Sequence, residues 1–198
     1  MIIGIVCYPT FGGSGVLATE LGVELSKKGH EIHFITYNQP VKLELLSNNV
    51  HFHEVVVPDY PLFHYPPYEL ALSSKLVEMV KKYNIDVLHV HYAIPHAYAA
   101  FMAKQMLNSE RIRIPVFTTL HGTDITLVGS HPSYKSAVEF SINNSDYVTT
   151  VSKSLKNDTT NLFNIQTEIN VIPNFVNLDK YQKQNVPIDL LTKNNKII

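Results

Sequence analysis

Gly12-Gly13-Ser14-Gly15 follows an apolar run at residues 2–7 and precedes a leucine stripe at positions 17, 21 and 25. A strand, a glycine-rich turn and a helix start predict a βα unit whose turn lies at the positive end of a helix dipole. Backbone N–H groups there can bind an anion without a lysine or an arginine. The alternative is structural, with the glycines forming a tight turn and Ser14 capping the helix. The tetrad lacks both the Lys-Ser/Thr ending of a Walker A loop and the spacing of a dinucleotide fingerprint.

The composition excludes a strongly charged surface. Lysine and arginine number 16 against 17 aspartate and glutamate, a formal net charge of −1. We therefore expect neither nucleic acid nor an anionic membrane as a partner. The single cysteine, Cys7, lies inside the first apolar run, which predicts a buried thiol, excludes an intrachain disulfide and fits a reducing compartment. That run is too short for a signal peptide or a membrane span, so we expect a cytoplasmic protein. Homo-oligomer formation stays open.

Short aliphatic runs alternate with helical patterns along the chain. The runs predict strands at residues 2–8, 31–37, 50–57, 87–92, 115–120, 147–151 and 169–172. The intervening patterns predict helices at residues 15–28, 68–83, 95–107, 132–143 and 153–162. Most runs lack strict alternation, which is typical of strands buried on both faces of a parallel sheet. The predicted fold class is α/β, a doubly wound, mostly parallel, Rossmann-like sheet.

The chain divides into two expected parts. Residues 1–176 carry the whole α/β pattern and form the predicted domain. Residues 177–198 are polar and weakly patterned until Lys196-Ile197-Ile198, which has the character of another strand start. We expect a linker there, followed by the beginning of a truncated C-terminal domain. A separate Pro- and Tyr-rich loop at residues 58–67 is long enough to act as a lid or a binding segment.

Polar residues gather where the predicted strands end, the edge at which doubly wound sheets bind ligands. Beyond the glycine turn they are His89, His91, Tyr92, His96, Thr118, Thr119, His121, Gly122, Thr123, Asp124, Ser152, Lys153, Ser154 and Asn174. His89 and His91 share one face of their strand. No cysteine or carboxylate completes a metal-ligand set with them, which favours hydrogen-bonded histidines over a metal site.

The sharpest of these clusters is His121-Gly122-Thr123-Asp124. Its glycine permits an unusual backbone, and Asp124 can hydrogen-bond a ring nitrogen or cap the next segment. The alternative is an Asp-containing turn without a functional role. No Gly-x-Ser-x-Gly lies at a strand–helix turn, so a hydrolase nucleophile elbow is not indicated.

Together with Ile172-Pro173-Asn174, the glycine turn and this cluster resemble the motifs of retaining glycosyltransferases with the GT-B architecture. Two further motifs resemble the branch that glycosylates L-malate in bacillithiol biosynthesis: Cys7-Tyr8-Pro9 and His89-Val90-His91-Tyr92-Ala93-Ile94-Pro95-His96-Ala97. The resemblance extends from residue 1 to about residue 181. It implies two Rossmann-like domains with the active site between them, of which this chain is the N-terminal, acceptor-binding one.

The resemblance also implies the reaction and the site residues. N-acetylglucosamine passes from UDP-N-acetylglucosamine (UDP-GlcNAc) to the malate hydroxyl with retention of configuration, without a cofactor or a metal. Acceptor binding is assigned to Gly13, Ser14, Tyr92 and Thr118, and the catalytic role to His121, which hydrogen-bonds the donor sugar or its phosphate. Donor contacts are assigned to Gly12, Gly15, Asp124, Ser152 and Asn174. A covalent intermediate on Asp124 is the weaker mechanistic alternative.

The family's donor-domain lysine and glutamate, and a basic residue that helps to clamp malate, have no counterpart in the sequence. We therefore expect this chain to be inactive without the missing C-terminal donor domain. Three other readings stay open. A relative that uses inositol phosphate requires a basic cluster near the glycine turn, and a dinucleotide oxidoreductase requires an acidic residue where Tyr37-Asn38-Gln39 stands. The third is a non-catalytic binding module.

Overall fold

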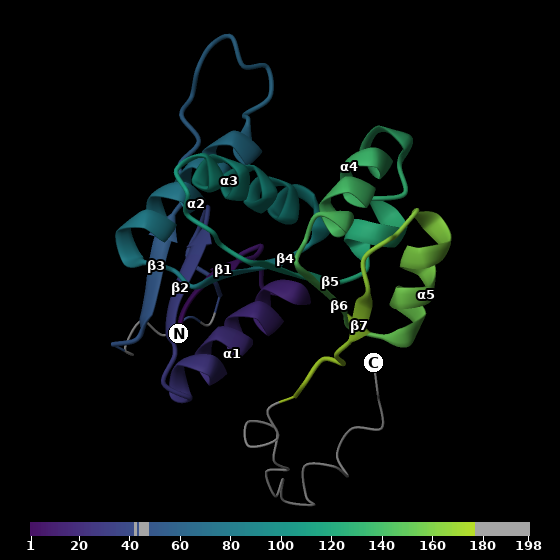
Figure 1. The fold of residues 1–198 in the computed structure, drawn as a ribbon, viewed down its shortest axis with the longest axis horizontal. Helices are drawn as coiled ribbons and strands as arrows, with labels where there is room; N and C mark the ends of the chain where they lie inside the picture. Colours follow the sequence, from purple (N-terminus) through teal and green to yellow (C-terminus); the bar gives the residue numbers. More distant parts are fainter. Residues whose placement is uncertain (42, 44–47, 177–198) are drawn as a thin grey trace, which may run out of the picture.

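A computed structural model describes residues 1–41, 43 and 48–176 and shows one seven-stranded sheet in the order β3-β2-β1-β4-β5-β6-β7 (Figure 1). Every neighbouring pair of strands is parallel. The strands are β1 (Ile2–Val6), β2 (Glu31–Thr36), β3 (Val50–Glu54), β4 (Val87–His91), β5 (Val116–Leu120), β6 (Tyr147–Thr150) and β7 (Ile169–Val171). The predicted doubly wound α/β class is confirmed. The linker predicted at residues 177–198 lies outside the described residues.

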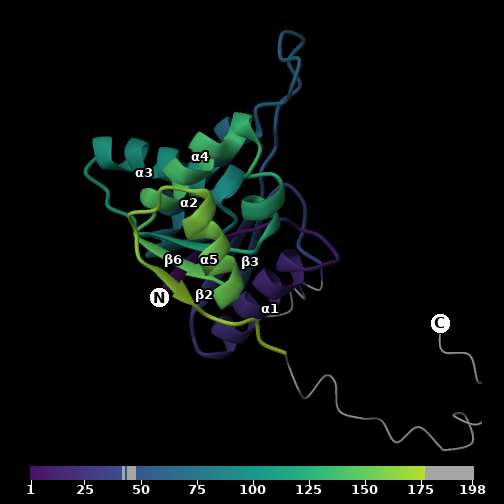
Figure 2. The same ribbon diagram turned by 90° about the vertical axis from the view of Figure 1, so that its right-hand side faces the viewer.

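In the part of the chain that the structure describes, five α-helices and two short turns accompany the strands. They are α1 (Ser14–Lys27), α2 (Tyr68–Tyr83), η1 (Ala93–Ala97), α3 (Tyr98–Ser109), η2 (Thr123–Leu127), α4 (Pro132–Asn143) and α5 (Lys153–Leu162). The bounds of α2, α4 and α5 match the prediction. Figure 2 shows α2, α3 and α4 above the sheet and α1 below it. No helix in the described ranges is both long enough and apolar enough to span a bilayer.

The helix predicted at residues 95–107 is wrong at its start. The chain first forms the irregular turn η1, and α3 begins only at Tyr98. Ile94 has an extended backbone (φ −130°, ψ 142°). The ring of Pro95 disfavours helical angles in the residue before it, which explains the interruption. The delay leaves room for a polar turn directly after β4.

Three apolar clusters hold the layers together. The largest lies between the central strands and the helices α2 and α3, where Leu72, Leu76 and Leu88 are completely buried. On the opposite face, α1 packs on β1 and β2 around Phe34. Cys7 belongs to that second cluster, and burial raises the pKa of its thiol to about 12, so the predicted buried thiol is confirmed. The third cluster lies under α4 and α5.

The strand order fixes where a ligand site is expected. From β1 the sheet grows to one side through β2 and β3, and from β4 it grows to the other side through β5, β6 and β7. The switch point therefore lies between the carboxyl ends of β1 and β4, and doubly wound sheets bind ligands in the crevice at that point.

Candidate functional site

Two residues predicted to bind the acceptor meet at this switch point. Ser14 follows β1, Tyr92 follows β4, and the Ser14 hydroxyl donates a 2.8 Å hydrogen bond to the Tyr92 hydroxyl. Ser14 is buried, with 7% of its surface exposed, and Tyr92 is half-buried. The structure thus places together two polar groups that stand 78 positions apart in the chain.

The start of α1 has the geometry of an anion site. Gly13 is the N-cap residue and has φ +54°, a conformation that favours glycine, and no side chain caps this helix end. The alternative in which Ser14 caps the helix is wrong, because Ser14 is already helical and its hydroxyl bonds Tyr92. The first-turn N–H groups of an uncapped helix need hydrogen-bond acceptors. The helix dipole favours an anion as that acceptor.

Gly12 and Gly15 differ in their surroundings, although the sequence predicts a donor contact for both. A Cβ at Gly12 would meet nothing within 4 Å, whereas a Cβ at Gly15 would lie 2.4 Å from the carbonyl oxygen of Tyr8. Gly15 is buried. Its role is to let α1 approach the chain after β1, so the structure does not support a donor contact by Gly15.

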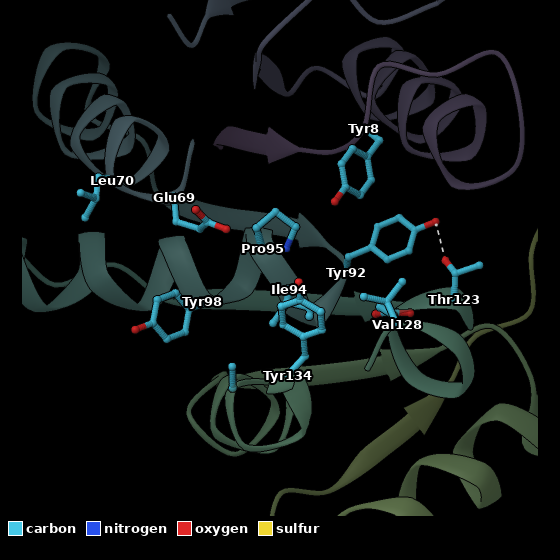
Figure 3. A pocket seen from close by; sticks show the side chains of 12 residues that line it. Tyr8, Glu69, Leu70, Tyr92, Ile94, Pro95, Tyr98, Thr123, Val128 and Tyr134 are labelled. Atoms are coloured by element: carbon cyan, nitrogen blue, oxygen red, sulfur yellow. Dashed lines mark hydrogen bonds between the residues drawn. The ribbon is translucent and has the colours of Figure 1, made fainter. Parts of the chain in front are cut away.

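Tyr92 has an unusual backbone. Its φ is +85° and its ψ 137°, outside the regions that bulky side chains ordinarily adopt. Such a conformation persists only where the surroundings enforce it, and it is concentrated at functional sites. The Tyr92 ring packs against Tyr8 at 5.2 Å and against His121 at 5.3 Å between centroids. Thr123 donates a long 3.4 Å hydrogen bond to the Tyr92 hydroxyl (Figure 3).

Asp124 organises the turns after β4 and β5. One carboxylate oxygen accepts the N–H of Ala93 at 3.0 Å, and the other accepts the N–H groups of His121 at 3.2 Å and Gly122 at 2.9 Å. Asp124 is 2% exposed, and burial raises the pKa of its carboxyl against the opposing effect of these hydrogen bonds. Both oxygens serve the backbone, so the prediction of a donor contact or a nucleophile at Asp124 is not supported.

His121 ends a hydrogen-bonded pair of histidines. Its Nε2 lies 2.8 Å from Nδ1 of His91, whose own Nε2 is buried without a partner among the described residues. Burial lowers the pKa of His121 to about 4, so the ring is neutral at pH 7. His89 is hydrogen-bonded to the Thr119 hydroxyl at 2.8 Å, and the expectation of hydrogen-bonded histidines on this strand is confirmed.

Thr118 is not in the site. It is completely buried, and its hydroxyl lies 2.7 Å from the Ser145 hydroxyl. The neighbours of Thr118 in register, Val90 and Val148, are core residues beneath the helices. Neighbouring residues of a strand face opposite sides, so Thr119 points to the other face of the sheet. The structure thus places Thr118 in the core under the helices, and its assignment to the acceptor stays a prediction that this placement does not favour.

The two remaining predicted donor residues occupy different settings. The Ser152 hydroxyl accepts the N–H of Leu155 at 3.1 Å and caps α5. Asn174 is exposed and lines a cavity of about 270 Å³ together with His89, His91 and His121. A donor contact by Ser152 or Asn174 stays a prediction.

A larger cavity of about 530 Å³ opens beside Tyr92. It is lined by Tyr8, Glu69, Leu70, Tyr92, Ile94, Pro95, Tyr98, Thr123, Asp124, Val128, Tyr134 and Ala137 (Figure 3). The sequence analysis missed Tyr8, Glu69 and Tyr134 as lining residues. Tyr8 was marked only as part of the Cys7-Tyr8-Pro9 motif, without a role. Glu69 and Tyr134 lie in first turns of helices, where no motif marks them.

Two carboxylates line this cavity, those of Glu69 and Asp124. Glu69 lies on the far side of Pro95 from Tyr92 in Figure 3. The Asp124 carboxylate lies near Tyr92, because it accepts the N–H of the next residue, Ala93.

The chain is similar to known glycosyltransferases. The sequence model of Glycosyltransferase Family 4 matches residues 11–180. The chain is 51% identical over 184 residues to the N-acetyl-alpha-D-glucosaminyl L-malate synthase of Bacillus anthracis, a match that covers 93% of this chain and 48% of that protein. It is 28% identical over 172 residues to an uncharacterized glycosyltransferase of Methanocaldococcus jannaschii, covering 87% of this chain and 45% of that protein. The chain spans about half the length of the curated relatives it matches.

Solved structures share the fold. A glycosyltransferase from Rickettsia africae matches with a TM-score of 0.66 at 23% identity, over 97% of this chain and 48% of that chain. Sucrose-phosphate synthase from Thermosynechococcus elongatus matches with a TM-score of 0.67 at 16% identity, over 90% of this chain and 49% of that chain. The sheet is accordingly one Rossmann-like half of a GT-B architecture.

Proposed function

This chain belongs to glycosyltransferase family 4, and from that premise we propose that it is the acceptor-binding half of an enzyme that glycosylates L-malate. The donor in this proposal is UDP-GlcNAc, and the anomeric configuration is retained. The observation that carries the proposal is the 51% identity to the Bacillus anthracis synthase, whose name specifies an N-acetyl-glucosaminyl product of L-malate. Residues 1–176 form the acceptor domain in this proposal.

The glycine turn suits a dicarboxylate acceptor. A malate carboxylate at the start of α1 accepts hydrogen bonds from the backbone of Gly13 and Ser14, with the helix dipole favouring its charge. The hydroxyls of Ser14 and Tyr92, joined at 2.8 Å, supply further hydrogen bonds beside it. These contacts hold the acceptor hydroxyl in one orientation, and orientation is a large part of what such an enzyme contributes to the rate.

The transfer step in this proposal needs no nucleophile from this half. The malate hydroxyl oxygen bonds to the anomeric carbon as the bond from that carbon to the diphosphate oxygen breaks. The hydroxyl proton passes to the departing UDP, which leaves from the same face. His121 is neutral and anchored to His91, so it hydrogen-bonds the donor without adding a full charge.

The test is a titration of this chain with L-malate and, separately, with UDP-GlcNAc, read from backbone amide NMR. We expect L-malate to shift the amides of Gly13, Ser14 and Tyr92, and UDP-GlcNAc to shift them little. Glutarate is the control, because it carries two carboxylates but lacks the malate hydroxyl and differs from malate in the spacing between the carboxylates. Shifts with the nucleotide sugar alone would reverse the domain assignment, and no response to L-malate would contradict a preformed acceptor site.

A chimera tests the activity itself. In it, residues 1–176 of this chain replace the matching residues of the Bacillus anthracis synthase, and the intact synthase is the positive control. We expect UDP release that depends on L-malate. A folded chimera that hydrolyses the donor but does not use L-malate would contradict the proposed acceptor.

A further inference from the structure

Three histidines and a glutamate cluster on the edge strand β3 and its neighbour β2, toward the end of the sheet opposite to the glycine turn. Glu31 is the first residue of β2, and His33 lies directly opposite His51 of β3 in the register. Alternate residues of a strand share a face, so Glu31 and His33 point to the same side, as do His51 and His53 on the neighbouring strand. The proposed transfer reaction uses none of these residues.

The two distances from the Glu31 carboxylate to the histidine nitrogens match those between ligands of one small cation. Glu31 Oε1 lies 3.1 Å from His33 Nε2 and 3.3 Å from His51 Nε2, and the three ligand atoms all lie within 4.8 Å of one another. Two atoms bonded to a tetrahedral zinc ion, each at roughly 2.0–2.1 Å, are about 3.3 Å apart. Two imidazoles and a carboxylate are also a ligand set that zinc uses where a fourth position is left to water.

A further histidine fixes the orientation of the buried ring. His33 Nδ1 lies 2.8 Å from His53 Nε2. A metal-bound histidine ordinarily uses its second ring nitrogen in such a bond, which sets the tautomer. When His33 Nδ1–H donates to His53, the lone pair of His33 Nε2 is directed toward Glu31. The Tyr83 ring at the end of α2 packs on both imidazoles, with centroid distances of 4.5 Å to His33 and 4.9 Å to His53.

The cluster is half open to solvent. The His33 side chain is completely buried, whereas 41% of the Glu31 side chain and 39% of the His51 side chain are exposed. A cation can therefore enter from solvent and keep a water ligand.

We propose that Glu31, His33 and His51 bind one divalent cation of the zinc class, with His53 positioning His33. The site lies on the face covered by α2 and joins β3 to β2. Within the described residues, β3 is the last strand of the sheet and pairs with β2 alone, so the bound cation stabilises an edge strand that is held by a single ladder. A ligand that binds only the folded chain raises the free energy of unfolding. This proposal is independent of the acceptor and the donor.

Zinc and cobalt titrations test the site directly. The chain, prepared without a histidine tag and stripped with a chelator, is titrated with ZnCl₂ by calorimetry and with CoCl₂ by visible absorption. We expect one equivalent of Zn²⁺, the intense visible bands of tetrahedral Co²⁺, and a higher melting temperature with Zn²⁺. Glu31→Gln and His51→Gln should each weaken zinc binding more than about a hundredfold, and His53→Gln roughly 10–100-fold, as an outer partner does. His64→Gln, in an exposed loop, is the matched control and should bind as the wild type does.

Two results would overturn the proposal. One is no saturable binding of Zn²⁺ to the folded chain, which would leave Glu31, His33 and His53 as a hydrogen-bonded chain only. The other is binding that survives both Glu31→Gln and His51→Gln, which would place the ion elsewhere. Both residues are half-exposed, so their variants keep the core, and circular dichroism on each one establishes that it folds.

Discussion

Ser14 Oγ and Tyr92 Oη lie 2.8 Å apart and join the turn after β1 to the end of β4. The pair spans the switch point, where the strand order reverses. This hydrogen bond therefore forms only when both halves of the sheet are in place. The first two predictions concern this point.

Tyr92→Phe should weaken malate use while leaving donor binding unchanged. The ring packing on Tyr8 and His121 survives, but the hydroxyl that accepts from Ser14 is lost. Losing one such hydrogen bond costs about 1 kcal/mol, so we expect the KM for L-malate to rise roughly five- to tenfold in the chimera. Ser14→Ala should act in the same direction. Tyr98→Phe, which lines the same cavity from α3, is the control. Unchanged malate kinetics in both Tyr92→Phe and Ser14→Ala would remove these residues from the acceptor site.

Gly15→Ala should destabilise the fold, whereas Gly12→Ala should not. The added methyl group at Gly15 would meet the carbonyl oxygen of Tyr8 at 2.4 Å, and at Gly12 it would meet open space. Overpacking of this kind costs about 1–3 kcal/mol. Urea unfolding of the two variants beside the wild type measures the difference, and equal midpoints would contradict the close approach.

Asp124→Asn should lower stability and disturb the neighbouring turns. The amide places an NH₂ group where a carboxylate oxygen now accepts the N–H of Ala93 or those of His121 and Gly122. An unsatisfied buried donor costs about 1–3 kcal/mol. Asp59→Asn, in an exposed loop, is the control. A variant as stable as the wild type, with unchanged amide shifts at Ala93, would show that the carboxylate is dispensable.

Stability should fall as the pH falls from about 6.5 to 4. Burial lowers the pKa values of His89, His96 and His121 to about 4, and an unfolded histidine titrates near 6.5. The unfolded chain therefore binds more protons in this interval, so the stabilisation present above pH 6.5 is lost on acidification.

The buried His96 tests this dependence most cleanly. A single histidine of this kind contributes a slope approaching about 1.4 kcal/mol per pH unit. His96→Asn keeps a donor for the carbonyl of His91, which His96 Nδ1 now bonds, but cannot titrate. Urea unfolding at several pH values, with a chelator present, should show a shallower slope for the variant than for the wild type. A steeper or equal slope would contradict the low pKa.

The isolated chain should release no UDP above background from UDP-GlcNAc, with or without L-malate. The proposed donor domain supplies the groups that neutralise the departing diphosphate, because no lysine or arginine is among the described residues that line the cavity beside Tyr92. Coupled detection of UDP, with the chimera as positive control, measures this. Malate-dependent release by the chain alone would place the catalytic groups in this half.

The sequence predicted most of the fold because the elements carry clear local signals. Pro132 at the first position of α4 and Ser152 before α5 mark helix starts, and Gly29, with φ +87°, follows the end of α1. β5 ends at Leu120 as predicted, but the other strands end earlier, β3 at Glu54 rather than residue 57, where apolar residues continue past the last ladder bond. The irregular turn before α3 was not predicted, because the helical pattern of residues 95–107 was given more weight than the effect of Pro95 on the residue before it.

The site was predicted only in part, for a geometric reason. Residue type shows that Thr118 and Thr119 are polar, but it does not show which of them faces the helices. That choice depends on Val90 and Val148, which flank Thr118 in the core. Likewise, Asp124 was correctly singled out, but three backbone donors from two segments converge on it only in the folded chain.

The convergence of those donors on Asp124 has a consequence for how such enzymes diversify. The Asp124 carboxylate fixes the backbone at Ala93, in the turn after β4, and at His121, in the turn after β5. These two turns therefore form a unit that tolerates little variation. The cavity wall formed by Glu69 and Leu70 of α2 and by Tyr134 of α4 makes no bond to that carboxylate. Acceptor preference can therefore evolve by exchange at these helix starts, while the reacting geometry is inherited intact.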